Sequence, residues 1–239
     1  SRHPDAEYDI NHPAWNPAER LHWTEPFYGF YRHDDPYVLR KHAEMLADAG
    51  VDVIIFDCTN GTFTWPEGYN VIFKVFSEAK EEGVDVTQVA FMLNFAPNDD
   101  SRTELKMLYG QIYSKGKYQD LWFYWDDKPL IMAHKNCLDL SNNKDKEISE
   151  FFTFRQNEPT YFAKDTNISQ KVWGWCSVYP QTKYGVREDG SVEQMTVNVA
   201  QNASEHGLVA MNDYRGGVFG RGYAKGDYSY TFKYKNEDV

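Results

Sequence analysis

The sequence contains no cluster of basic residues and no apolar run of membrane-spanning length. A transmembrane helix needs about 20 predominantly apolar residues, so we expect no membrane span. The chain has 25 Lys and Arg against 36 Asp and Glu, for a formal net charge of −11. Nucleic-acid binding requires clustered Lys and Arg, and we expect no nucleic-acid partner. An acidic polysaccharide would also be repelled unless a local basic patch received it.

Cysteine is scarce, and the motifs of several enzyme classes are missing. The three cysteines, Cys58, Cys137 and Cys176, match neither a zinc motif nor a disulfide framework. None of the seven histidines is paired with another at metal-ligand spacing. No glycine-rich phosphate fingerprint follows a predicted strand, and no serine-centred nucleophile elbow is present. We therefore expect no metal and no cofactor.

Aromatic residues are abundant. They make up 16% of the chain and include 17 Tyr and 7 Trp, many in polar surroundings. Tyr and Trp combine a flat apolar face with a polar tip, and sugar rings offer matching C–H faces. The composition is therefore typical of a carbohydrate-binding protein. Half-buried aromatics in a loop-rich protein would give the same composition, and this alternative stays open.

Helical and strand-like segments alternate along the chain. The first helix has Asp35 as its N-cap, Pro36 in its first turn and Gly50 after its end. The other expected helices cover residues 69–82, 102–114 and 144–150. Strands are expected over residues 51–56, 89–94, 121–134 (two strands around a turn), 151–155 and 172–177, whereas 193–200 is ambiguous.

This alternation predicts an α/β protein with a parallel sheet. The length of 239 residues is slightly short of the roughly 250 that a TIM-type (β/α)8 barrel needs. We predict such a barrel, incomplete at both chain ends, as a single domain over residues 1–239. Residues 1–35 form an irregular, aromatic-rich lead-in, and residues 215–239 an irregular tail. A doubly wound sheet is the main alternative.

In a barrel of this kind the active site lies at the carboxyl ends of the strands. An apolar strand leads directly into Asp57, which could act as base, nucleophile or sugar-binding group, or could only cap the next turn. Glycoside cleavage needs two carboxylates, and we take Glu25, flanked by aromatics, as the candidate second acid. The candidate substrate-binding residues are His22, Asn60, Asn94, Trp125, His134, Arg155, Trp175, Tyr179 and Gln181.

Several of these segments resemble a known group of proteins. Asp35–Asp52 and its continuation Phe56–Gly61 are similar to glycoside-hydrolase-like (β/α) barrel proteins of polysaccharide-degrading bacteria of the Bacteroidetes type. They are more distantly similar to the endo-α-mannosidase and α-1,3-glucanase families. Leu121–Trp125 with Lys128–Leu130, Phe151–Arg155 and Val178–Gln181 also resemble this group. The resemblance covers about residues 5–210.

The resemblance implies a secreted or periplasmic glycoside hydrolase acting on an oligo- or polysaccharide, with Asp57 at a matching strand end. The chain departs from the group at both ends. It lacks the aromatic strand that precedes the lead-in and the late Asn-Glu-Trp-like strand that carries catalytic acids in the endo-mannosidases, so this chain alone is expected to lack the second carboxylate. A non-catalytic carbohydrate-binding barrel and a carbohydrate lyase remain alternatives.

Overall fold

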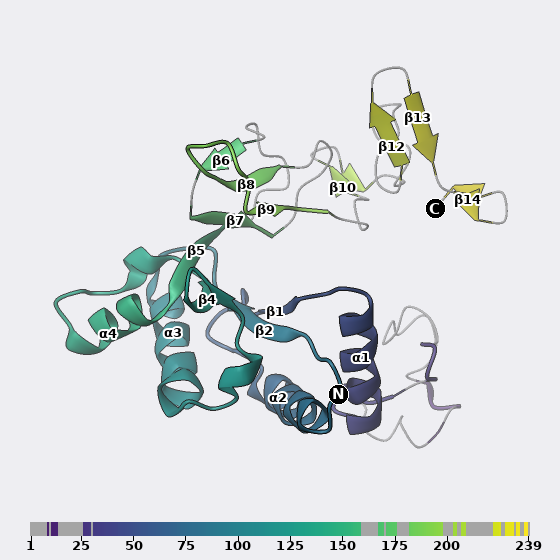
Figure 1. Ribbon diagram of the computed structural model, residues 1–239, viewed down its shortest axis with the longest axis horizontal. Coiled ribbons are helices and arrows are strands. Elements are labelled where there is room, and N and C mark those ends of the chain that lie inside the picture. Colours follow the sequence, from purple (N-terminus) through teal and green to yellow (C-terminus); the bar gives the residue numbers. More distant parts are fainter. Residues whose placement is uncertain are drawn as a thin grey trace.

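A computed structural model gives the fold of most of the chain (Figure 1). It describes residues 9, 11–13, 26–29, 31–158, 167–169, 171–175 and 182–197, and the backbone of short strands between residues 203 and 238. A mostly parallel six-stranded sheet is combined with helices. The mixed α/β class predicted from the sequence is therefore confirmed.

The helices begin where the sequence provides a cap. They are α1 (Pro36–Asp48), α2 (Pro66–Glu81), α3 (Asp99–Gln111) and α4 (Asn143–Phe151), with short 3-10 turns η4 (Tyr113–Lys115), η5 (Gln119–Leu121) and η6 (Lys135–Cys137). Side chains of Asp35, Asn98 and Asn142 accept hydrogen bonds from first-turn backbone amides of α1, α3 and α4, as good N-caps do. In α2 the N-cap is Trp65, which makes no such bond.

The main sheet follows the order of the chain. Its parallel strands are β1 (Val53–Asp57), β2 (Gln88–Met92), β4 (Lys128–Met132), β5 (Thr153–Glu158) and β7 (Val172–Gly174), and each lies beside the one before it. The short β3 (Tyr124–Trp125) pairs antiparallel with β4. The expected turn between β3 and β4 is present, with positive φ angles of 51° at Asp126 and 64° at Asp127.

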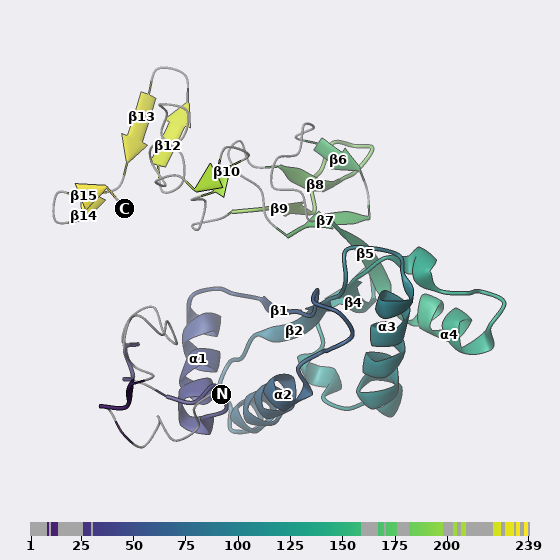
Figure 2. The ribbon, with the colours of Figure 1, turned by 180° about the vertical axis from the view of Figure 1, so that it is seen from behind.

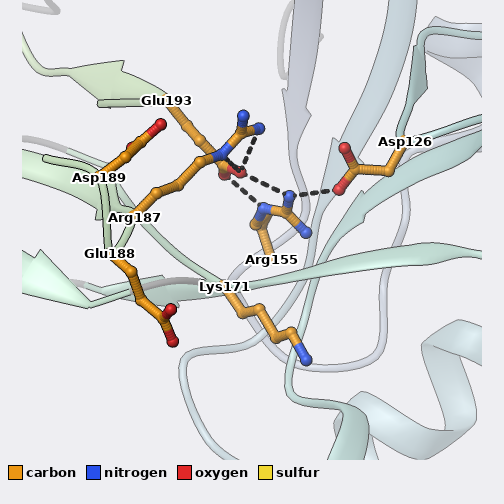
Figure 3. A pocket seen from close by; sticks show the side chains of 7 residues that line it. All are labelled: Asp126, Arg155, Lys171, Arg187, Glu188, Asp189 and Glu193. Carbon is orange, nitrogen blue, oxygen red and sulfur yellow. Dashed lines mark hydrogen bonds and ion pairs between the residues drawn. The ribbon is translucent and has the colours of Figure 1, made fainter. Parts of the chain in front are cut away.

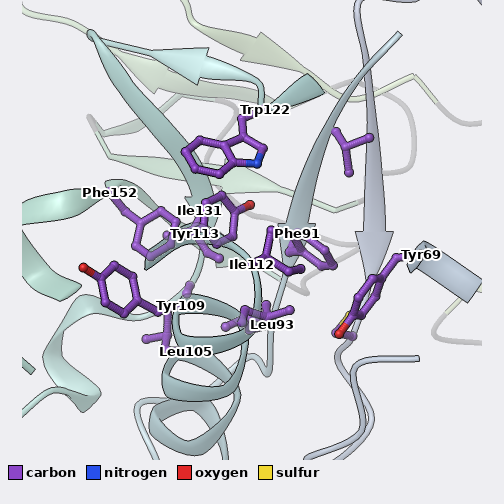
Figure 4. Close-up of a cluster of buried hydrophobic side chains, with 14 of the residues drawn as sticks. Tyr69, Phe91, Leu93, Leu105, Tyr109, Ile112, Tyr113, Trp122, Ile131 and Phe152 are labelled. Atoms are coloured by element: carbon purple, nitrogen blue, oxygen red, sulfur yellow. The ribbon is translucent and has the colours of Figure 1, made fainter. Parts of the chain in front are cut away.

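Apolar side chains cover both faces of this sheet, as expected for parallel strands. One face packs on the helices, through Phe91 of β2, Leu93 just after β2 and Ile131 of β4, against aromatic side chains such as Tyr113 of η4 (Figure 4). The opposite face carries Met92 of β2 and Met132 of β4 and is covered by other strands. Figures 1 and 2 show α1 and α2 on one side of the sheet and β6, β8 and β9 on the other.

The covering strands form a second, smaller sheet. It consists of β6 (Asn167–Ser169), β8 (Lys183–Val186) and β9 (Gln194–Met195), in the order β6-β8-β9. Tyr184 of β8 is fully buried against the main sheet. It packs so closely on Gly174 of β7 that an added Cβ at Gly174 would lie 2.2 Å from the tyrosine ring. Glycine at this position is what allows the two sheets to meet.

Two expectations about the later part of the chain differ from the structure. The strand expected over residues 151–155 is β5, Thr153–Glu158, because Phe151 still belongs to α4. Within the segment expected to be an irregular tail, the structure describes β12 (Gly222–Lys225), β13 (Tyr228–Thr231), β14 (Lys233–Tyr234) and β15 (Glu237–Asp238) as two antiparallel pairs. A further pair, β10 (Ala203–Ser204) and β11 (Gly207–Leu208), precedes them.

Candidate functional site

Polar and aromatic residues gather at the carboxyl ends of the parallel strands. β1 ends at Asp57, β5 ends at Glu158, and β2, β4 and β7 are followed closely by Asn94, His134 and Trp175. Because neighbouring parallel strands point the same way, all five residues lie along one edge of the sheet. We refer to this edge as the carboxyl edge.

Asp57 combines the two roles that the sequence left open. Its Oδ1 accepts a hydrogen bond of 3.0 Å from the backbone amide of Thr59, so it braces the turn after β1. The residue is nevertheless exposed, and a carboxylate accepts several hydrogen bonds. Asn60, in the turn that follows, is also exposed. Asp57 therefore does cap the turn, as one of the two alternatives predicted, but this bond uses only one of its carboxylate oxygens.

Asn94 connects the loop after β1 to a buried acid of α3. Its amide Nδ2 donates to the backbone carbonyl of Gly61 at 2.6 Å and to Oε2 of Glu104 at 2.8 Å. Glu104 is completely buried, and burial raises its pKa to about 7, although the bonds from Asn94 act in the opposite direction. Asn94 is thus held in place by its amide group, and the sequence had given no sign of Glu104 behind it.

His134 is buried with one ring nitrogen unused. Its side chain hydrogen-bonds the backbone of Phe95, whereas Nε2 finds no partner among the described residues. Burial lowers the pKa of His134, while the Phe95 backbone and the charge of Glu158 act to raise it. The imidazole is therefore neutral near pH 7. Since Nε2 makes no hydrogen bond within the described part of the chain, the bond to the Phe95 backbone is assigned to Nδ1. The lone pair of Nε2 can then accept a proton or a hydrogen bond.

The end of β5 adds two groups that the sequence did not indicate. Asn157 is 1% exposed, and its Nδ2 donates to the backbone carbonyl of Leu93. Its Oδ1 has no hydrogen-bond partner in the described part of the chain. Glu158 follows it, close enough for its charge to act on His134. The strand had been expected to stop at Arg155, because the residues after it, Gln156 to Glu158, are all polar and give no apolar strand pattern.

An aromatic pair lies at the same edge. The Trp175 ring is 40% exposed and lies 6.1 Å from the ring of Phe95. The backbone amide of Trp175 donates to the carbonyl of Glu158 at 3.1 Å, which fixes the tryptophan beside the end of β5. The carboxyl edge therefore offers a carboxylate, a neutral imidazole and a flat aromatic surface within one row of strand ends.

Two of the predicted binding residues lie away from this edge. The antiparallel direction of β3 places Trp125 beside Lys128, the first residue of β4, and its ring packs against Trp173 at 5.2 Å. Arg155 is the third residue of β5 and not its last. Trp125 does end β3, but β3 runs antiparallel to β4, so this end lies at the opposite edge of the sheet. The expectation that Arg155 ends its strand was wrong, because β5 continues to Glu158.

Arg155 belongs to a cavity near the amino-terminal ends of the strands (Figure 3). The cavity has a volume of about 450 Å³ and is lined by Asp126, Arg155, Lys171, Arg187, Glu188, Asp189 and Glu193. Arg155 and Glu193 are buried together, with 5% of each side chain exposed and an N–O distance of 2.6 Å. Asp126 binds the same guanidinium at 2.8 Å. We call Arg155 and the residues that bind it the Arg155 network.

The Arg155 network leaves few hydrogen-bonding groups free. The remaining guanidinium nitrogen of Arg155 donates to the carbonyl of Phe154, while Glu193 also accepts from Trp173 at 2.8 Å and from Arg187 at 3.1 Å. Burial acts to raise the pKa of Glu193, but the bonds from Arg155, Trp173 and Arg187 lower it to about 2. The network joins β5 and β7 to the second sheet, which is a structural role.

The other predicted site residues are not all placed. Glu25, His22, Tyr179 and Gln181 lie outside the described residues. Where side chains are described, no three His, Cys, Asp or Glu groups come together in a way that could hold a metal ion. None of the described helices is both long and apolar enough to cross a membrane.

Comparison with known proteins gives no relative. No family model matches the chain, and no curated protein and no solved structure matches it. The function must therefore be argued from the site itself.

Proposed function

We propose that this chain is a glycoside hydrolase built on a TIM-type (β/α) barrel, with its substrate bound at the carboxyl edge. The observation that carries the proposal is the row of strand ends, where an exposed carboxylate, a neutral histidine and an exposed tryptophan occur together. Active sites of (β/α) barrels are built from such strand ends. The parallel strands also follow one another in chain order, as barrel strands do.

Two carboxylates lie at this edge. Asp57 ends β1 and Glu158 ends β5, with β2 and β4 between these strands. In a closed barrel, strands separated in this way face each other across the mouth. One carboxyl group would then protonate the leaving oxygen while the other activates water or attacks the sugar. Glu158 thus takes the place of the second acid that the sequence alone did not identify, and Glu25 remains a candidate outside the described residues.

The other groups of the edge would bind the substrate. Nε2 of His134 and Oδ1 of Asn157 are buried acceptors without partners among the described residues, and a hydroxyl group that reached either of them would supply the missing hydrogen bond. Trp175 would stack on a sugar ring, and Asn60 lies exposed beside Asp57. An oligo- or polysaccharide would supply both the hydroxyl donors and the apolar ring faces, and a secreted or periplasmic location would suit such a substrate.

The test is a search for hydrolysis over a panel of neutral and acidic polysaccharides, followed by substitutions at the two acids. Asp57→Asn and Glu158→Gln should each lower kcat by at least about 100-fold, the range for loss of an acid–base group, and should leave glycan affinity within a few-fold. Asp52→Asn is the matched control, since Asp52 is exposed just before β1, at the opposite end of the strand.

Each other outcome of this test has a defined meaning. Binding of a glycan without any cleavage would identify a carbohydrate-binding barrel and would refute hydrolysis. Unsaturated products would indicate a lyase. Unchanged turnover in both acid variants, alongside an active wild type, would remove Asp57 and Glu158 from the mechanism.

A further inference from the structure

A second exposed aromatic pair lies in the loop between β1 and α2. Phe63 is 46% exposed and Trp65 is 51% exposed, and their rings meet edge to face with centroids 4.7 Å apart. Between them, Thr64 is 1% exposed and points into the protein. The loop therefore turns its small polar residue inward and its two large apolar residues outward, which is the reverse of the usual pattern.

This loop is fastened along its length. It starts at the turn that Asp57 braces, and its middle is held by the 2.6 Å bond from Asn94 to the carbonyl of Gly61. Near its end, the buried thiol of Cys58 contacts the carbonyl of Thr64 at 3.6 Å. The two exposed rings are thus presented on an ordered loop that shares Asn94 and Asp57 with the carboxyl edge. An aromatic surface held in this way binds a ligand with little loss of conformational freedom.

The backbone at Trp65 is in a conformation that this residue type rarely adopts. Its φ is 57° and its ψ is 53°, in the left-handed region, where the Cβ of an L-residue is crowded. Trp65 is also the N-cap of α2 and makes no capping hydrogen bond. Glycine would relieve the crowding. Trp65 is strained, exposed and makes no capping bond, so it contributes little to the stability of the fold. Backbone strain of this kind is often found at functional sites.

We propose that Phe63 and Trp65 form a stacking subsite for a sugar ring that is distant from the cleaved bond. This inference rests on the proposed function. The pair would bind one ring of the glycan while the Trp175–Phe95 pair binds another. The chain would therefore favour oligosaccharides of several residues, whereas the shortest substrates would reach only one of the two pairs. The strand ends, with Asp57 at the foot of the same loop, lie on the path of a glycan that reaches both pairs.

The test uses Trp65→Gly, because glycine suits the left-handed backbone. Wild type and variant are compared on oligosaccharides of the cleaved glycan, from disaccharide to octasaccharide, and on an aryl glycoside of the same sugar. We expect kcat/KM on the longest chains to fall by about tenfold, the scale of one aromatic stacking contact, with no change on the aryl glycoside. The melting temperature should stay equal or rise. Trp65→Tyr, which keeps a ring, should restore most of the loss.

Tyr124→Ala is the matched control. Tyr124 is a similarly exposed aromatic residue, at 45%, but it lies in β3 beside the start of β4, away from the carboxyl edge. It should leave the length profile unchanged. Equal losses for Trp65→Gly on short and long substrates, or none at all, would overturn the subsite while leaving the hydrolase intact. A lower melting temperature with an unchanged length profile would show that Trp65 only supports the fold. If the wild type neither binds nor cleaves any glycan, the proposed function itself fails.

Discussion

The Arg155 network and the carboxyl edge of the parallel sheet use similar residue types in opposite ways. In the network, Arg155 and Glu193 are buried and bind each other and several further groups. At the carboxyl edge, polar atoms of Glu104, His134 and Asn157 are equally buried but find no partner among the described residues. A buried polar group without a partner is costly. The comparison teaches that the Arg155 network holds the two sheets together, whereas the carboxyl edge keeps polar atoms that the described residues leave without hydrogen bonds.

The largest effect is expected in the Arg155 network. Glu193→Gln should lower the free energy of unfolding by about 3–5 kcal/mol, because it leaves the buried Arg155 without its main counter-ion. Chemical denaturation measures this change. Glu188→Gln is the control, since Glu188 lines the same cavity but is exposed, and it should change stability by less than about 0.5 kcal/mol. Equal effects of the two substitutions would contradict a structural role for the network.

The two regions should also respond oppositely to pH. Folding raises the pKa of Glu104 from 4.5 to about 7, so the folded state keeps a proton that the unfolded chain releases. The free energy of unfolding should therefore fall by about 3 kcal/mol as the pH rises from about 4.5 to 7. In Glu193 the pKa falls from 4.5 to about 2, so its stabilising contribution is lost as the pH drops through that range.

Denaturation curves of the wild type and of Glu104→Gln across this pH range isolate the contribution of Glu104 to the free energy of unfolding. The difference in stability between wild type and Glu104→Gln should change with pH from about 4.5 to 7 and be constant above it. A difference that does not vary with pH would mean that Glu104 titrates normally, and that the carboxyl edge is less strongly desolvated than its burial indicates.

The smallest effect on stability is expected at His134. His134→Asn should change the free energy of unfolding by less than about 1 kcal/mol, because only one hydrogen bond of the imidazole is used within the described residues. Turnover of the glycan should nevertheless fall by at least about tenfold, the loss of one hydrogen bond to substrate. If His134→Asn unfolds the protein while leaving the activity of the folded fraction unchanged, the contrast between the two regions fails.

Local signals predicted the α/β class and several element boundaries, and they placed Asp57 correctly at a strand end. The cap at Asp35, with Pro36 behind it, marks the start of α1 in both sequence and structure, because capping depends on neighbouring residues. Asp57 follows an apolar run, and the structure places it at a strand end as expected. The polar composition of β5 concealed its length, since Arg155, Gln156 and Asn157 do not form an apolar run. Its extent was therefore underestimated, and Glu158 was missed.

Contacts between distant parts of the chain could not be predicted. Arg155 and Glu193 are 38 positions apart, and no spacing rule pairs them. Without that pairing, Arg155 looked like a free cation suited to a substrate. Similarly, Glu104 lies on a helix otherwise rich in charged residues, and only its packing against Asn94 shows that it is buried. In both cases burial, which composition does not reveal, decides whether a charge is available.

On β5, Arg155 and Asn157 are two residues apart and so point to the same face of the sheet. The guanidinium is clamped from three directions just before the strand reaches the open edge. The backbone at Asn157 is therefore held by the ion pairs of Arg155, two residues before it. For the proposed glycan this means that the edge would already be ordered by folding, so that binding would cost little further loss of conformational freedom in the protein.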